Sequence, residues 1–304
     1  MGTEGQLALD LEGSGAILNA GTLERKQRPL KCELYNDSFQ NFKKYAVPRA
    51  QLVIADVPYN VGGNMYGSNP MWYKGGDNSN GESKFAGKAA FYSDYNFNLY
   101  EYFHFCNRLL KKDPKGKSIR GRSSDAPCMI VFCSFEQIPT LKAAAAKHGF
   151  IHSIPLVFIK HSSAQALKAN MRIVGATEYA LVLYRDKLPK FRNGAQYDAD
   201  GRAIRGTGHM VFNWMEWIPD NRREIPKLHP TQKPQSVLRK LIETFTDPGD
   251  VVIDPVAGSG STLRAAHDLG RNAYGFECYR EFVAKAKAEM LNFNGGGTED
   301  GKEP

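Results

Sequence analysis

Short apolar runs alternate with amphipathic segments along most of this chain. Each run holds four to six residues and is almost wholly apolar, which is typical of strands covered on both faces. These runs predict strands at residues 31–35, 51–55, 129–133, 155–159, 179–184, 251–255 and 272–277. Helical patterns lie between them at residues 136–148, 234–246, 261–269 and 279–293. The alternation predicts an α/β fold with a doubly wound, mostly parallel sheet.

Two long stretches interrupt this alternation. Residues 60–100 are rich in Gly, Asn and aromatic residues, and residues 186–228 contain Gly, Arg and Trp without a clear period. Loops of this length in a compact domain are usually functional or mobile. We therefore predict one domain at residues 29–293, between a flexible N-terminal segment (1–28) and a disordered tail (294–304).

Composition and charge restrict the class of protein. The chain has 304 residues, 42% of them hydrophobic, which is enough for a sizeable core. No apolar run reaches the length of about 18 residues that a membrane span needs, and no secretory signal begins the chain. Five scattered cysteines without a Cys-x-x-Cys pair argue against a zinc site or a disulfide framework. These features predict a cytoplasmic protein without a metal, and the net charge of +8 is compatible with a nucleic acid partner.

A glycine turn follows one predicted strand in the C-terminal part of the chain. The strand ends at Asp254, the turn Gly258-Ser259-Gly260 comes next, and the following strand ends in Glu277. Glycines let a backbone approach a ligand closely, and an acid at the end of the second strand suits ribose hydroxyls. The third glycine of the dinucleotide fingerprint is missing, and Asp254 would repel a pyrophosphate. A carboxylate at this place suits a cationic methionine moiety, so the pattern favours S-adenosylmethionine over a nicotinamide cofactor.

A second turn, Asp56-Val57-Pro58-Tyr59, follows the apolar run at residues 51–55. Pro58 restricts Val57 to an extended conformation, which can turn the Val57 carbonyl outward. That carbonyl and the Asp56 carboxylate would form two acceptors near one point, which match an exocyclic amino group. Tyr59 offers a ring face on which a planar base can stack.

Taken together, these segments resemble the amino-methyltransferase family that modifies DNA at adenine N6 or cytosine N4, in the permuted group usually called β. LYNDSFQNF, ADVPYN, HPTQKP and DPVAGSGST stand in the order of that group, and the resemblance spans about residues 31–290. It implies the fold of S-adenosylmethionine-dependent methyltransferases, with an inserted loop and basic region (60–122) and a target-recognition region (186–228). The chain departs from the family pattern at Val57, where Pro is usual, and at Val256, where Phe is usual. Neither change removes a required chemical group.

The resemblance assigns roles residue by residue. The catalytic tetrad is matched by Asp56, Val57 through its carbonyl, Pro58 and Tyr59. The cofactor site is matched by Asp37, His229, Pro230, Thr231, Lys233, Asp254, Ala257, Gly258, Ser259, Gly260, Ser261, Thr262 and Glu277. In this assignment Glu277 is the ribose-binding acid and Asp37 contacts the adenine of the cofactor.

Basic residues are the candidate contacts to DNA. They come from the run at residues 106–122 and from the region 186–228, and could bind phosphates or read guanines. The candidates are Lys111, Lys112, Lys115, Lys117, Arg120, Arg122, Arg192, Arg202, Arg205, Arg222 and Arg223. The loop that follows the tetrad is expected to close over a flipped base.

The resulting prediction is a site-specific methyl transfer from S-adenosylmethionine to N6 of an adenine flipped out of double-stranded DNA. Asp at the first tetrad position accompanies adenine in the resembled family, and no cysteine nucleophile is needed. Two alternatives stay open, which are N4-cytosine methylation and a catalytically silent DNA-binding relative. The resembled group often forms dimers, which raises a homodimer as a partner; a cognate restriction enzyme cannot be read from the sequence.

Overall fold

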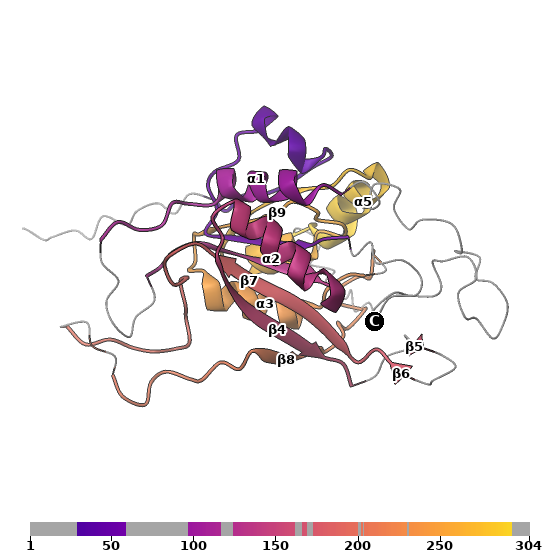
Figure 1. The fold of residues 1–304 in the computed structure, drawn as a ribbon. Coiled ribbons are helices and arrows are strands. Elements are labelled where there is room, and N and C mark those ends of the chain that lie inside the picture. The colour runs from indigo at the N-terminus through magenta and orange to yellow at the C-terminus, as the bar shows by residue number, and fades with distance from the viewer. Residues whose placement is uncertain are drawn as a thin grey trace, which may run out of the picture.

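Eight strands form one mixed sheet in the order β1-β10-β9-β2-β3-β7-β4-β8 (Figure 1). The computed structural model describes residues 29–58, 97–116, 124–161, 166–168, 173–199, 202, 204–229 and 231–293. The strands of this sheet are β1 (Cys32–Tyr35), β2 (Leu52–Asp56), β3 (Cys128–Cys133), β4 (His152–Ile159), β7 (Thr177–Tyr184), β8 (Trp214–Glu216), β9 (Val251–Asp254) and β10 (Asn272–Phe276). Only β7 runs against its neighbours β3 and β4, so the predicted α/β fold with a mostly parallel sheet is confirmed. A separate small sheet pairs β5 (Ala166–Lys168) with β6 (Ile173–Val174).

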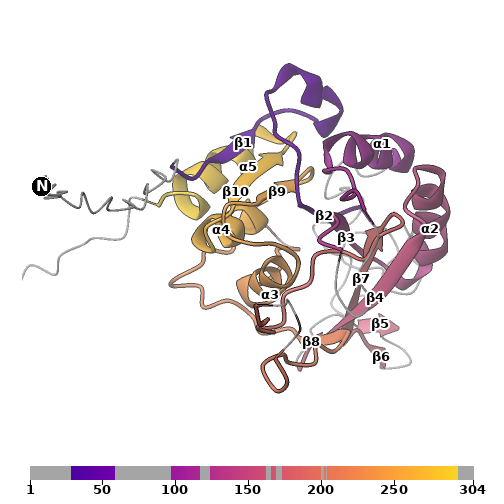
Figure 2. The ribbon, with the colours of Figure 1, turned by 90° about the vertical axis from the view of Figure 1, so that its left-hand side faces the viewer.

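Helices cover both faces of the large sheet (Figure 2). α1 (Leu99–Leu109) and α2 (Ile138–Lys147) pack on one face, and α3 (Gln235–Phe245), α4 (Ser261–Asp268) and α5 (Arg280–Lys285) pack on the other. Leu52 and Ile54 of β2 belong to the core beneath α3 and α4, whereas Val53 and Ala55 face α1. Alternate residues are therefore buried in different layers, which is why these strands appear in the sequence as unbroken apolar runs.

Some predictions from the sequence were wrong in detail. The strand predicted at residues 155–159 begins earlier, at His152, and β4 is exposed at His152, Ile154 and Pro155. In its second half Leu156 and Phe158 are buried on one face, whereas Val157 and Ile159 on the other face are only partly buried. α1 was not predicted, since its aromatic-rich sequence continues the composition of the preceding stretch. The Asn98 side chain begins this helix by accepting hydrogen bonds from two backbone amides. β8, the edge strand of the large sheet, was also missed inside the region 186–228, where its three residues leave no period to detect.

No helix among the described residues is long and apolar enough to cross a membrane. Within the same part of the chain, no cluster of three or more His, Cys, Asp or Glu side chains has the arrangement of a metal site. The predicted flexible ends, 1–28 and 294–304, and most of the stretch 60–100 lie outside the described residues.

Candidate active site

Two turns that are far apart in the sequence meet at the carboxyl ends of adjacent strands. β2 and β9 pair in parallel, with Val53 opposite Ile253. β2 ends at Asp56 and β9 ends at Asp254, so both acids lie at one edge of the sheet. The structure therefore brings the Asp56 turn and the glycine turn together at one edge of the sheet.

Asp56 has one engaged and one unengaged carboxylate oxygen. The Lys233 ammonium lies 2.6 Å from Oδ2, and the Lys233 side chain is only 7% exposed. Oδ1 is buried and has no hydrogen-bond partner among the described residues. Burial raises the pKa of Asp56, and the charge of Lys233 opposes that rise. An acceptor that is buried without a donor is costly, so Oδ1 is a natural place for the donor of a bound substrate.

The glycine turn joins β9 to α4 through two left-handed backbone positions. Gly258 has a φ of 50° and Gly260 a φ of 76°, which side-chain-bearing residues rarely adopt. The Gly258 amide donates to Glu277 Oε2 at 2.9 Å, and the Tyr279 amide donates to Glu277 Oε1 at 2.8 Å. The acid at the end of β10 therefore lies directly against the turn at the end of β9. Burial raises the pKa of Glu277.

Asp254 is a nearly fully buried acid beneath this turn. Its Oδ1 accepts a hydrogen bond from the Val256 amide at 3.0 Å. Burial raises the pKa of Asp254 to about 7, the hydrogen bond from Thr262 opposes the rise, and the nearby charges of Asp56 and Glu277 add to it. Burial and neighbouring acids disfavour the charged form of Asp254. A cationic ligand would stabilise that charged form.

Asp37 lies in the loop after β1, at the same edge of the sheet. Its carboxylate accepts hydrogen bonds from the Ser38 amide, the Asn41 side chain and the Tyr45 hydroxyl. Asn36 of this loop donates to the Glu277 carbonyl at 3.0 Å. The Asp37 loop is therefore tied to the end of β10, next to the glycine turn.

The segment before α3 reaches the same place. The His229 ring packs against Phe282 and lies beside Gly258, and its Nδ1 is 3.0 Å from the Thr231 hydroxyl. Burial lowers the pKa of His229 to about 4, and the charge of Lys233 adds to this effect. At neutral pH His229 is therefore an uncharged wall of the site.

Gln137 supports the Asp56 turn from the next strand end. Its side-chain amide donates to the Pro58 carbonyl at 2.7 Å, while its Oε1 accepts from the Ser134 amide. Val57 is buried. Tyr59 and Pro230, which were predicted to belong to the site, lie outside the described residues.

The sequence matches a known family. The N6/N4 methylase model, described as "DNA methylase", matches residues 50–288 of the chain. The chain belongs to the N6/N4 DNA methylase family. It is 25% identical over 277 residues to the DNA adenine methyltransferase YhdJ of Escherichia coli K12, across 83% of this chain and 80% of YhdJ.

Two solved structures share the fold of this DNA methylase. The M1.HpyAVI–SAM complex superposes with a TM-score of 0.56 at 20% identity, across 85% of this chain and 98% of that one. The cytosine-N4-specific PvuII DNA methyltransferase gives a TM-score of 0.57 at 16% identity, across 86% of each chain.

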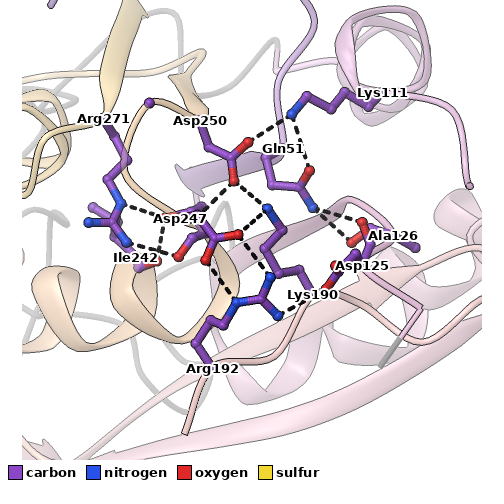
Figure 3. Close-up of polar contacts among 12 residues, drawn as sticks. Gln51, Lys111, Asp125, Ala126, Lys190, Arg192, Ile242, Asp247, Asp250 and Arg271 are labelled. Atoms are coloured by element: carbon purple, nitrogen blue, oxygen red, sulfur yellow. Dashed lines mark hydrogen bonds and ion pairs between the residues drawn. The ribbon is translucent and has the colours of Figure 1, made fainter. Parts of the chain in front are cut away.

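Two of the described basic candidates for DNA contact, Lys111 and Arg192, lie away from Asp56 of the methylase. Lys111 Nζ lies 2.8 Å from Asp250 Oδ1, just before β9 begins, and Arg192 binds Asp247 in the same turn (Figure 3). Both therefore lie at the amino ends of the strands, the edge opposite the candidate site. The other described candidates are all exposed: Lys112, Lys115, Arg202, Arg205, Arg222 and Arg223. Lys117, Arg120 and Arg122 lie outside the described residues.

The charged cluster in Figure 3 leads to a prediction about stability. Lys190, which is 8% exposed, contacts Asp247 at 2.7 Å and Asp250 at 2.6 Å. Lys190→Met should lower the free energy of unfolding by about 2–3 kcal/mol, because it removes the shared cation from a partly buried network. Urea denaturation checks the value, and Lys142→Met at an exposed site of α2 is the control.

The same cluster should make the free energy of unfolding of the methylase fall at low pH. The Arg192 guanidinium holds the pKa of Asp247 well below its usual range. Burial raises the pKa of Asp250, but hydrogen bonds from Lys111 and Lys190 outweigh it, so the net shift is downward. Stability from such depressed carboxylates is present above the unfolded pKa of about 3.9 and is lost as the pH falls below it. A Lys190→Met variant that matched the wild type at every pH would contradict this role.

Sequence reasoning missed three residues that support Asp56. Gln137 was read only as part of a helix, and its contact with Pro58 depends on the tertiary fold. Lys160 directly follows β4, so a search for polar residues after apolar runs would have found it. Glu178 lies near the start of β7 and reaches the same edge only because β7 is antiparallel, which no local pattern reveals.

Proposed function

We propose that the chain is a site-specific DNA methyltransferase of the permuted β group, which transfers a methyl group from S-adenosylmethionine to N6 of a flipped adenine. The observation that carries this proposal is the Asp56 carboxylate. Among the residues that the structure describes, its buried Oδ1 accepts no hydrogen bond, and it lies at the end of the strand beside the glycine turn. An exocyclic amino group would supply the missing donor.

The glycine turn and its surrounding acids suit S-adenosylmethionine. The left-handed positions at Gly258 and Gly260 keep the turn open toward a ligand, and Glu277 is held beside it. Asp254 would attract the cationic methionine end, Glu277 would accept from ribose hydroxyls, and Asp37 would face the adenine. The sulfonium of the bound cofactor supplies an electrophilic methyl group. The uncharged His229 adds no repelling cation to this end of the site.

Asp56 is the residue that prepares the amino group for transfer. Asp56 and the Val57 carbonyl would each accept a hydrogen bond from one N–H of the amino group. These two hydrogen bonds would direct the nitrogen lone pair at the methyl carbon. In the proposed transfer the nitrogen–carbon bond would form as the sulfur–carbon bond breaks, S-adenosylhomocysteine would be the leaving group, and the amino nitrogen would lose one proton to solvent. Positioning and the fixed negative charge beside the developing positive nitrogen would supply most of the rate enhancement.

Adenine is the proposed base, and cytosine is the second candidate. The relative YhdJ is named an adenine methyltransferase, whereas the structurally similar PvuII enzyme is named cytosine-N4-specific. Asp56 at the first tetrad position supports adenine through the family resemblance.

Analysis of the methylated nucleoside tests the proposal. The protein is incubated with double-stranded DNA and methyl-tritiated S-adenosylmethionine, and the DNA is digested to nucleosides. We expect label in N6-methyladenine, at one sequence context that methylation-aware sequencing of the same DNA would identify. Label in N4-methylcytosine would establish the second candidate. DNA binding without any label would instead indicate a catalytically silent relative.

A further inference from the structure

A row of alternating charges lies behind Asp56 on the carboxyl edge of the sheet. Lys160 Nζ is 2.6 Å from Glu178 Oε1, and Glu178 Oε2 is 3.8 Å from Lys233 Nζ. Lys233 Nζ in turn is 2.6 Å from Asp56 Oδ2. The side chains of Lys160, Glu178 and Lys233 are 15%, 18% and 7% exposed, so water screens these charges weakly. Lys160 follows β4, Glu178 lies in β7 and Lys233 precedes α3. Only the tertiary fold brings these three segments together.

Aromatic rings hold the two lysines in place. The ammonium groups of Lys160 and Lys233 lie 5.0 and 5.8 Å from the centre of the Trp217 ring. Lys233 also lies 5.2 Å from the centre of the Phe132 ring. Cation–π attraction at these distances helps to hold both ammonium groups in place beside the rings.

Lys233 lies between two carboxylates but binds Asp56 more closely than Glu178. Both Asp56 and Glu178 attract the single Lys233 ammonium, and Asp56 holds it at the shorter distance. Glu178 has its own cation in Lys160. Without Lys160, Glu178 would lose the cation that lies 2.6 Å from it and would compete more strongly with Asp56 for Lys233.

We propose that Lys160 and Glu178 are positioning residues for the methyl transfer: Lys160 neutralises Glu178, which leaves Lys233 on Asp56 Oδ2 and Oδ1 available to the amino group. This inference rests on the proposed function, because it takes Asp56 as the acceptor for the target base. It adds two residues, one directly after β4 and one in β7, that act on Asp56 through Lys233 and through their own charges.

Several groups around Asp56 bear on its ionisation. They come from β3, the residue directly after β4, β7, β9 and the segment before α3, in that order: Cys133, Lys160, Glu178, Asp254 and Lys233. His229 faces Lys233 from the same segment. Glu178 raises the pKa of Asp56, and Lys160 and Lys233 lower it. Loss of Lys160 should therefore raise the pKa of Asp56, and additional loss of the Glu178 charge should reverse the change.

The test compares Lys160→Met with the double variant K160M/E178Q. The apparent pKa of Asp56 is read from its carboxyl 13C signal in the protein without ligands, with Asp56→Asn identifying the signal. We expect a rise of about one unit in K160M and a return to the wild-type value in K160M/E178Q. The acid limb of kcat/KM for DNA methylation should move in parallel, giving a loss of about tenfold on the acid side that higher pH restores. Lys142→Met, which removes an exposed lysine, is the control.

The outcomes separate the inference from the proposed function. A loss in K160M that is equal at every pH, an unmoved Asp56 signal, or a double variant that fails to recover would each overturn the positioning role. If K160M does not bind S-adenosylmethionine, the positioning role is tested by the double variant alone. K160M/E178Q must then show the wild-type acid limb of kcat/KM and the wild-type pKa of the Asp56 carboxyl signal. A wild-type protein that transfers no methyl group would refute the proposed function, while the carboxyl signal still reports whether Lys160 controls Asp56.

Discussion

Asp56→Ala should abolish most methyl transfer while leaving S-adenosylmethionine binding intact. The substitution removes the buried acceptor and the fixed negative charge beside the reacting nitrogen, and a group of this kind contributes about 10²–10³-fold to the rate. The proposed cofactor contacts on β9, β10 and the glycine turn do not involve the Asp56 side chain, so we expect them to remain in place. Transfer of tritium to DNA measures the first effect, and isothermal titration with the cofactor measures the second.

Two further variants sharpen this prediction. Asp56→Asn keeps the size of the side chain but loses its charge, so it should resemble Asp56→Ala if the charge is what matters. Asp186→Ala removes an exposed acid just beyond β7, at the opposite edge of the sheet, and should leave the rate unchanged. Full activity in Asp56→Ala would remove Asp56 from the mechanism.

Asp254→Asn should weaken binding of S-adenosylmethionine by about 10–100-fold, because a buried charge-assisted contact is worth about 1.5–3 kcal/mol. The asparagine oxygen can still accept the hydrogen bond from the Val256 amide, so the local backbone is preserved. Titration calorimetry gives the affinity, with Asp186→Asn as the matched exposed substitution. An unchanged affinity would show that Asp254 does not face the cation.

The pH dependence distinguishes this loss from misfolding. Burial raises the pKa of Asp254 to about 7, so the wild-type affinity for the cation should fall as the pH drops below that value. The affinity of Asp254→Asn should lack this dependence. A raised carboxyl pKa stabilises the fold at low pH and is a cost once the pH exceeds the folded pKa. The ligand-free variant should therefore be at least as stable as the wild type in alkaline solution.

Much of the fold could be predicted because the signals are local. Apolar runs such as residues 51–55 and 251–255 lie in the middle of the sheet, where both faces are buried and the pattern is unbroken. Prediction failed where burial is one-sided or an element is short. β4 is exposed over part of its length, and β8 has three residues at the sheet edge.

The candidate site also contains residues that could be predicted from the sequence and contacts that could not. Asp56, the glycine turn and Glu277 could be found because each directly follows an apolar run, and the carboxyl ends of parallel strands share one edge. Chain order alone could not show that β9 lies beside β2, nor that Lys111 and Arg192 are engaged at the far edge. A run of basic residues in the sequence does not indicate at which edge of the sheet those residues lie.

The sequence by itself therefore determined the chemical groups of this methylase and the strand ends that present them, because turn and strand preferences act between neighbouring residues. The tertiary structure alone decided how those groups pair. Lys233 meets Asp56 across 177 positions of the chain, and the antiparallel course of β7 brings Glu178 within reach of it. Such pairings follow from strand order and burial, which depend on the whole chain packing at once.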